Sequence, residues 1–420
     1  GSAEFVALAA LLALVVGVAR VAVGAFGVGW ISYLMSKPVL EGFMAGAAVL
    51  IVASQLPGAL GVDPPEGGVI RQALWSLRHP GSWEMAALGM AGGTVGAVVF
   101  ARRVHPLVPG VLVASVVGLG GSILFDYQGA VVGHVPTGLP PMSVSFPWGR
   151  IPELFLPGVI IALVGFAEAS SISRSFAAEE RDRWNADREF IGQGAANVVA
   201  GLTGGFPVGG SFGRSSLNRL AGATSRWSGL VTGLAVLLFL PFADLLAALP
   251  RAILAGIVIA AVLKLLKPHG LLRLWSISRP QATVGSSTFL LTLALAPRVE
   301  QAVLLGVVGA GAVHLWRELR LKVRARRDGD TLHLHPIGVL WFASAPVLDD
   351  EILEHLGRDR DVKKIVLHMA GLGRVDLTGA TTLADMLDQL RASGLEVSVD
   401  GVPHHAFRVL RGVGAPGVDE

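Results

Sequence analysis

Cysteine is absent from this chain of 420 residues, and charged side chains are scarce. The absence of cysteine excludes disulfide frameworks, thiolate metal sites and cysteine nucleophiles. Charged residues make up 15% of the chain and hydrophobic residues 52%. The net charge of +3 is too small to indicate a nucleic-acid-binding protein, so we expect no nucleic acid among its partners.

The charged residues are unevenly distributed along the chain. Of the 65 charged residues (34 basic and 31 acidic), residues 1–316 contain 35 and residues 317–420 contain 30. About one residue in nine is therefore charged in the first part and nearly one in three in the last, a step that a soluble globular protein does not show. We predict a membrane domain at 1–316, a basic linker at 317–330 and a soluble domain at 331–420.

Runs with few or no charged residues mark the predicted membrane spans. Residues 42–62 and 104–125 contain no charged side chain, and each is long enough as a helix to cross a hydrocarbon core about 30 Å thick. With the shorter runs we expect roughly ten spans, plus one irregular segment near 203–222. The shorter runs lie at about 5–28, 84–101, 154–177, 188–204, 226–247, 250–266, 282–297 and 299–316.

Glycines recur inside these runs. They suit the close approach of helices in a membrane bundle, although glycines that merely face lipid would give the same pattern. Both interpretations stay open for Gly42, Gly46, Gly89, Gly92, Gly93, Gly96, Gly306, Gly309 and Gly311.

Residues 331–420 alternate between strand-like and helix-like patterns. TLHLHPIGVLWFA, KKIVLHM and LEVSVDG read as strands, whereas VLDDEILEHL and TGATTLADMLDQLRASG read as helices. Strands separated by helices predict a small α/β domain. A cluster of basic residues precedes it, and such clusters mark the cytoplasmic side of a membrane. The cluster comprises Arg317, Arg320, Lys322, Arg324, Arg326 and Arg327.

The most informative stretch is 201–227, which lies between apolar runs yet contains seven glycines and a proline. Irregular backbone survives in a membrane only where protein buries it or where it lines a watery cavity. Ser211 is a candidate N-cap, and a helix from there to Gly222 would rise about 16 Å, half of the hydrocarbon core. Its N-terminus would lie near the midplane and bind an anion, with Arg214 adding positive charge. The alternative is a kink whose Arg214 reaches the membrane interface.

Glu168 is a carboxylate inside an apolar helix, and Ser171 and Ser175 share its helical face. A charge is costly in lipid, so Glu168 should face the bundle interior or water. It could be a site that couples to a proton or another cation, because its surroundings decide how readily a carboxyl ionises. Alternatively, it only fixes helix packing, either neutral or paired with Arg174 or Arg214.

Two further polar residues, Gln193 and Asn197, lie one helical turn apart in an apolar run. They could hydrogen-bond to the backbone of the irregular segment, but we favour a role as hydrogen-bonding groups between helices. The histidines are scattered without ligand spacing, so we expect no metal site.

Several segments together resemble the sulfate permease (SulP) family of anion transporters, which includes prestin-like proteins. They are SKPVLEGFMAGAAVLI, GFAEASSISRSFA and DREFIGQGAANVVAGLTGGFPVGGSFGRSSLNRLAGATS, and the terminal domain is similar to the sulfate transporter and anti-sigma-factor antagonist (STAS) module. The resemblance implies an all-α membrane bundle of the seven-plus-seven inverted-repeat type, followed by a small α/β STAS domain. It also implies an elevator-like motion, a homodimer, and an anion held between two facing half-helices.

The first apolar run resembles the fourth span of the family. On this resemblance, the chain corresponds to about spans four to fourteen, so we expect the bundle to be N-terminally incomplete and the STAS domain to be short at its C-terminus. The resemblance further implies a multi-pass protein of the cell (inner) membrane with its STAS domain in the cytoplasm.

The resemblance also suggests site residues. Five residues fall on the family's Ser-x-Ser-Arg-Ser helix start, where the anion binds, and glycine replaces the second serine, which removes one hydroxyl donor. Glu168 falls where relatives carry an acidic residue implicated in sodium or proton coupling, and Ile172 replaces a threonine of the sodium sites. This favours H+ over Na+ as the coupling ion, and no cofactor is implied. The substrate-binding residues are Ser211, Phe212, Gly213, Arg214 and Ser215.

In the terminal domain, GLGRVDLTGATTL aligns with the Asp-x-Ser/Thr-Gly loop of STAS modules. Asp376 and Thr378 therefore occupy the loop that is phosphorylated in anti-sigma antagonists, which suggests a regulatory role. We favour Thr378 as the N-cap of a helix over 378–393 rather than as a phosphorylation site.

The sequence therefore predicts a secondary active transporter, not an enzyme, for a small inorganic or organic anion. Sulfate is the family default, and bicarbonate or a dicarboxylate stays open. A nucleobase carrier of the same architecture is a weaker alternative, since the STAS domain argues against it. An alternative of another class is a membrane-anchored STAS module that binds a cytosolic protein without transport.

Overall fold

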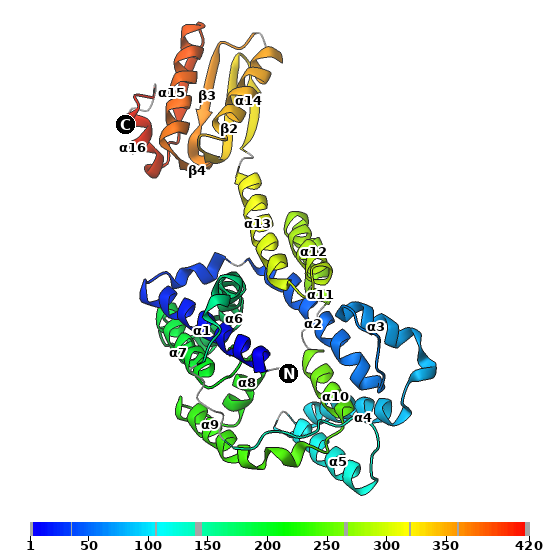
Figure 1. Cartoon of the computed structure of the whole chain (residues 1–420). Coiled ribbons are helices and arrows are strands. Elements are labelled where there is room, and N and C mark those ends of the chain that lie inside the picture. Colours follow the sequence, from blue (N-terminus) through cyan, green and yellow to red (C-terminus); the bar gives the residue numbers. More distant parts are fainter. Residues whose placement is uncertain are drawn as a thin grey trace. The chain divides into compact units, whose positions relative to one another are not determined.

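The computed structural model describes residues 3–34, 36–105, 107–138, 145–263, 268–318, 321–358 and 361–415. It divides into a helical unit, Gly1–Ala310, and a mixed α/β unit, Gly311–Glu420 (Figure 1). The division falls inside helix α13 (Val299–Glu318), which also contains the predicted domain boundary at residue 316.

In the described residues, the helical unit contains ten helices at the positions of the ten predicted spans, the predicted half-helix α8, and two amphipathic helices, α3 and α11, that were not predicted. Its helices before α13 are α1 (Ala3–Ala25), α2 (Lys37–Leu60), α3 (Val69–Arg78), α4 (Met85–Val104), α5 (Gly110–Leu124), α6 (Ile151–Glu180), α7 (Ala186–Leu202), α8 (Phe212–Leu220), α9 (Trp227–Phe239), α10 (Arg251–Val262), α11 (Pro268–Ile277) and α12 (Arg279–Ala294).

The helices at the ten expected spans differ in length. Six helical segments are long and apolar enough to cross a membrane, namely 3–25, 37–60, 85–104, 148–180, 227–246 and 299–318. The others, α5, α7, α10 and α12, have 12 to 17 residues. The predicted span at 104–125 is one such case, because α4 ends at Val104 and α5 begins only after Pro109, and the residue before a proline disfavours helix.

Contacts sort the helices of this unit into two groups. In the first, α1 packs against α6 and α7; in the second, α2 packs against α3, α4, α10, α11 and α12. Glycines let the backbones approach: a Cβ added at Gly17 of α1 would lie 2.7 Å from the backbone nitrogen of Val198, and one at Gly194 of α7 would lie 2.7 Å from that of Val21. Such spacing leaves no room for larger residues.

The glycines singled out in the sequence divide between the two interpretations. Gly42, Gly46 and Gly306 face neighbouring helices so closely that an added Cβ would overlap with them. The remaining six have open space around them in the described part of the chain, and these are Gly89, Gly92, Gly93, Gly96, Gly309 and Gly311.

The α/β unit has a sheet in the order β1-β2-β3-β5, with β4 paired to the end of β2. β1 is antiparallel to β2, and the other pairs are parallel, so helices connect them as predicted. The elements are β1 (Lys322–Asp328), β2 (Thr331–Leu340), α14 (Ala345–Arg358), β3 (Lys364–His368), β4 (Leu372–Val375), α15 (Leu377–Ala392), β5 (Glu396–Asp400) and α16 (His404–Gly412).

Strand β1 occupies residues that we expected to belong to the basic linker. Val323 and Ala325 alternate with the basic residues, and this period of two suits a strand. Val323 packs against the hydrophobic core that Leu332, Leu334, Ile365 and other buried residues form. The basic side chains therefore belong to the edge strand of a sheet.

Candidate functional site

The predicted half-helix exists as α8, nine residues long. Ser211 has extended backbone angles (φ −132°, ψ 119°), and the amide of Ser215 donates to the Ser211 carbonyl oxygen at 2.9 Å, so the helix begins where the sequence predicted. It ends before Gly222, whose φ of +91° breaks the helix. In any such helix the first amide groups have no acceptor within the helix itself.

Contacts with α6 fix the level at which α8 begins. The Gly210 backbone is packed against Ala169, because a Cβ at Gly210 would lie 3.0 Å from the Ala169 Cβ. At the other end of α8, Arg219 forms an ion pair with Glu180, the last residue of α6, and lies 5.6 Å from the ring centre of Phe176. The two helices therefore run in the same direction, and α8 begins beside the middle part of α6, within a 33-residue candidate span.

A hydrogen-bonded bracket holds the extended segment before α8. The Val208 amide donates to Asn197 Oδ1 at 2.9 Å, and Asn197 Nδ2 donates to the Val208 carbonyl oxygen, also at 2.9 Å. Asn197 is buried in α7. For Asn197, the alternative that we favoured less is therefore correct: its side chain binds the irregular segment's backbone.

The bracket has a second arm that the sequence analysis missed. Arg20 of α1 is 1% exposed. Its Nη1 donates to the Val208 carbonyl oxygen at 3.0 Å and to Gln193 Oε1 at 3.3 Å, and its Nε donates to the Ala162 carbonyl oxygen at 3.1 Å. Gln193 thus bonds between helices, as expected. A lone arginine in the run 3–25 was the available signal, because a charge in such a run must find partners.

Arg214 and Ser215 lie in the first turn of α8, and Arg214 is exposed while Ser215 is half-buried. The side chain of Phe212 and the surroundings of Gly213 lie outside the described part of the structure. The described residues thus bring Ser211, Arg214 and Ser215 to one helix end, where amide groups and a guanidinium can meet an anion.

Glu168 lies on α6 immediately before Ala169, the residue against which the segment leading to α8 packs. Its side chain is exposed, as are those of Ser171 and Ser175, which share its helical face. Arg174, a proposed partner, places its guanidinium 5.8 Å from the ring centre of Trp184.

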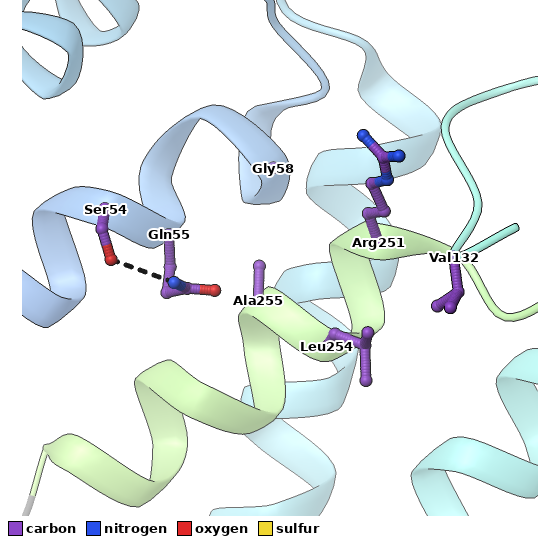
Figure 2. A pocket seen from close by; sticks show the side chains of 7 residues that line it. All are labelled: Ser54, Gln55, Gly58, Val132, Arg251, Leu254 and Ala255. Carbon is purple, nitrogen blue, oxygen red and sulfur yellow. Dashed lines mark hydrogen bonds between the residues drawn. The ribbon is translucent and has the colours of Figure 1, made fainter. Parts of the chain in front are cut away.

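A cavity of about 340 Å³ lies elsewhere in the helical unit. Figure 2 shows Ser54, Gln55 and Gly58 on α2 facing Leu254 and Ala255 on α10, with Val132 at the rim. Gln55 donates to Ser54 Oγ at 3.0 Å, the dashed line in Figure 2. This cavity contains none of the predicted site residues.

In the α/β unit, the N-cap of α15 is Asp376 rather than Thr378. Asp376 Oδ1 accepts a hydrogen bond from the Gly379 amide at 2.6 Å, and the helix begins at Leu377. The prediction for Thr378 was wrong because Asp376 is already extended (φ −90°, ψ 172°) and its carboxylate reaches the third amide of the helix. Thr378 is exposed in the first turn.

A histidine cluster on the same sheet was also missed. His333 Nδ1 lies 3.0 Å from His368 Nε2, and His368 Nδ1 lies 3.1 Å from Asp400 Oδ2. The ring of His335 stacks on that of His368 at 4.3 Å. Burial, and then the neighbouring charges led by His368, lower the pKa of His335. The alternation in TLHLH was the available signal, because it places both β2 histidines on one face.

Family comparisons cover both units. Residues 2–288 match the family described as "Sulfate permease family", and residues 323–417 match "Mlab, STAS domain". A sodium-independent sulfate anion transporter of Bos taurus is 26% identical over 98% of this chain and 74% of its own length. A probable sulfate transporter of Mycobacterium tuberculosis is 31% identical over 76% of this chain, and the match spans 56% of that protein.

Solved structures share the fold. The structure of SLC26A9 superposes with a TM-score of 0.85 at 17% identity, covering 100% of this chain and 74% of that one. The transmembrane domain of the cyanobacterial bicarbonate transporter BicA superposes with a TM-score of 0.62 at 27% identity, covering 73% of this chain and 77% of that domain. These likenesses confirm the predicted class of fold, a helical membrane transporter bundle followed by a small α/β domain.

Proposed function

Because the chain belongs to the sulfate permease family, whose members are multi-pass membrane transporters and not enzymes, we propose that it carries a small anion across a membrane by secondary active transport. The protein is an integral membrane protein with a STAS domain after its membrane part. We place that domain in the cytoplasm and the bundle in the cell membrane, because basic residues follow α13. The chain works as a homodimer in this proposal, which light scattering of the purified protein tests.

The main support for the proposal is the position of the α8 N-terminus along α6. Its first turn lies beside the middle of α6, and Arg214 is exposed there. An anion at this point meets the positive end of the helix dipole, amide donors without partners in the helix, and a guanidinium. Ser211 and Ser215 add hydroxyl donors, and Phe212 and Gly213 contribute backbone amides.

Sulfate is the substrate that we propose, with bicarbonate or a dicarboxylate as alternatives. Relatives that match most of the chain are named sulfate transporters, and BicA is named a bicarbonate transporter. A dianion gains more from the helix end and from Arg214 than a monoanion, because the Coulomb attraction scales with charge. The sequence has glycine at 213, so at this position the backbone amide rather than a serine hydroxyl contacts the anion.

Glu168 supplies the coupling to protons. It precedes Ala169, which contacts Gly210, two residues before α8 begins. An ionised Glu168 repels an anion at the α8 start, whereas a protonated Glu168 does not. Binding of a proton and binding of the anion therefore favour each other, as linkage requires, and the two move together.

Uptake of radiolabelled sulfate into proteoliposomes tests this proposal. We expect uptake above that of protein-free liposomes, and stronger competition by unlabelled sulfate than by bicarbonate or a dicarboxylate. An inward proton gradient should accelerate uptake, whereas a sodium gradient should not. Glu168→Gln should remove the pH dependence while sulfate still enters. Uptake by the Glu168→Gln protein with an unchanged pH profile would exclude its role in coupling.

The exposed start of α15 favours a second candidate function, a membrane-anchored STAS module that binds a cytosolic protein without transport. Thr378 and the flanking turn are accessible there, whereas Asp376 is engaged as the cap. Thermal unfolding of the purified chain separates the two. Stabilisation by sulfate but not by chloride supports transport, whereas no anion effect together with a stable protein complex supports the module.

A further inference from the structure

Arg20 is a buried cation whose role is not explained by helix packing alone. It is 1% exposed, and its three hydrogen bonds reach three elements: Ala162 of α6, Gln193 of α7 and Val208 of the extended segment. A guanidinium in such a place is stable only while its donors keep these acceptors. Its fork therefore fixes the positions of all three elements relative to one another.

The Val208 backbone is held from two sides. Asn197 bonds to both its amide and its carbonyl oxygen, and Arg20 bonds to the same carbonyl oxygen. Phe212, where α8 begins, lies four positions after Val208, and that length of chain spans at most about 14 Å. Ile172 and Ala169 pack against Gly210 in between, so the segment has little freedom to move independently of the bracket.

The described hydrogen bonds of Arg20 reach no carboxylate directly. Its hydrogen-bond acceptors are two carbonyl oxygens and an amide oxygen, which carry no net charge. Gln193 links Arg20 to a carboxylate, because its Nε2 donates to Glu189 Oε1 at 2.8 Å. The positive charge of Arg20 thus contacts the segment before α8 directly, through the Val208 carbonyl oxygen. The negative charge of Glu189 is linked to this segment only through Gln193 and Arg20.

We propose that Arg20 is a positioning residue for the anion site: together with Asn197 it fixes the segment that leads into α8, and its charge strengthens anion binding at the α8 start. This inference rests on the proposed function, since it assigns Arg20 to the same site.

The experiment compares sulfate uptake kinetics in proteoliposomes for three variants. Arg20→Gln removes the charge and the fork, Arg20→Lys keeps the charge but not the fork, and Asn197→Ala keeps Arg20 but removes the other arm of the bracket. Arg102→Gln is the matched control, because Arg102 of α4 also donates to a carbonyl oxygen of a neighbouring helix, that of Ala260 at 3.4 Å, in the other group of helices.

We expect Arg20→Gln to raise KM for sulfate about tenfold or more, with a smaller loss of maximal rate, and Arg20→Lys to recover part of KM. Asn197→Ala should raise KM by a few fold, and Arg102→Gln should leave KM unchanged. A wild-type KM in Arg20→Gln would overturn the inference, as would an equal rise in the control. A purely structural role would lower the amount of active protein and leave KM unchanged.

Hydrogen exchange of the intact chain keeps the inference testable if transport itself fails. Faster exchange of the peptide 203–216 in Asn197→Ala and Arg20→Gln, with unchanged exchange in α2 and α10, would support positioning; unchanged exchange at 203–216 would refute it. If the variants show this exchange pattern but the wild-type chain takes up no sulfate, the proposed function fails while the positioning of α8 stands. If Arg20→Gln does not fold, Asn197→Ala decides both measurements.

Discussion

Alanine accounts for 20 of the 37 buried hydrophobic residues described in Gly1–Ala310, but for only 5 of the 23 in Gly311–Glu420. In the helical unit many large apolar side chains instead point outward, as Phe100, Phe125 and Leu238 do, with 68%, 81% and 73% exposure. In the α/β unit leucine, isoleucine and methionine form the core, among them Leu334 and Met369.

The difference reflects the solvent of each unit. Lipid tails are as apolar as leucine, so large side chains gain nothing by leaving lipid, and helices in a membrane associate through close packing of small residues and through hydrogen bonds. Water expels large apolar side chains, so the α/β unit is stabilised by burying them. Large buried residues thus stabilise the α/β unit, whereas the helical unit requires a small residue wherever two helices approach closely.

The largest expected effect comes from removing a core side chain of the α/β unit. Leu334 is fully buried in β2, so Leu334→Ala should lower the free energy of unfolding of this unit by about 3 kcal/mol. The urea dependence of hydrogen exchange in the peptide 331–340 measures it. Leu353→Ala is the matched control, since Leu353 is 55% exposed, and equal effects of the two would contradict the comparison.

The opposite change, an added methyl group, should destabilise the helical unit. A Cβ at Gly42 of α2 would overlap with the Gly285 carbonyl oxygen of α12, so Gly42→Ala should cost about 2 kcal/mol. Thermal unfolding in detergent reports it. Gly89→Ala provides the control, because nothing described lies within 4 Å of its added Cβ, and alanine favours helix there by about 0.5–1 kcal/mol. A destabilised Gly89→Ala protein would contradict the idea that small residues are required only where helices approach closely.

A smaller effect tests how the α/β unit anchors its longest helix. Asp376→Ala removes the cap of α15 and should destabilise the unit by about 1 kcal/mol. Thr378→Ala should change little, because Thr378 is exposed in the first turn. The same hydrogen-exchange measurement compares them, and a larger loss in Thr378→Ala would restore threonine as the cap.

The smallest effect is a pH dependence that only the water-exposed unit should show. The pKa of His335 is lowered in the folded unit by burial, then by nearby His368, His333, Arg324 and Arg326. Below the ordinary pKa of about 6.5, the unfolded chain therefore binds more protons at this residue than the folded one, and stability falls as pH falls. Urea midpoints at pH 7.5 and 5.5 should show this loss, with a smaller loss in His335→Gln. An unchanged pH dependence in His335→Gln would exclude His335 as its source.

The sequence was informative about the membrane helices because lipid leaves the backbone few choices. An apolar run in hydrocarbon must satisfy its own backbone hydrogen bonds, so each run predicted a helix, and a helix lies at each of these positions in the described residues. The start of α8 was also predictable, because glycines and Ser211 interrupt an apolar stretch. The length of α5 was not, since Pro109 precedes its first residue and the predicted run began at 104.

Contacts between distant residues were beyond the reach of the sequence. Arg20 meets partners 142 to 188 residues away, and nothing local indicates which carbonyl oxygens it reaches. His368 joins His333 and Asp400 only through the register of β3 with two neighbouring strands. The cap of α15 was misassigned by two residues because both Asp376 and Thr378 are residues that commonly cap helices.

The most direct test of anion binding at the start of α8 is sulfate uptake by Arg214→Ala in proteoliposomes. Arg183→Ala provides the control, because Arg183 is likewise exposed but lies in the turn between α6 and α7. We predict that Arg214→Ala takes up no more sulfate than protein-free liposomes at concentrations that drive wild-type uptake, while Arg183→Ala matches the wild type. Wild-type uptake by Arg214→Ala would contradict the assignment of the anion site.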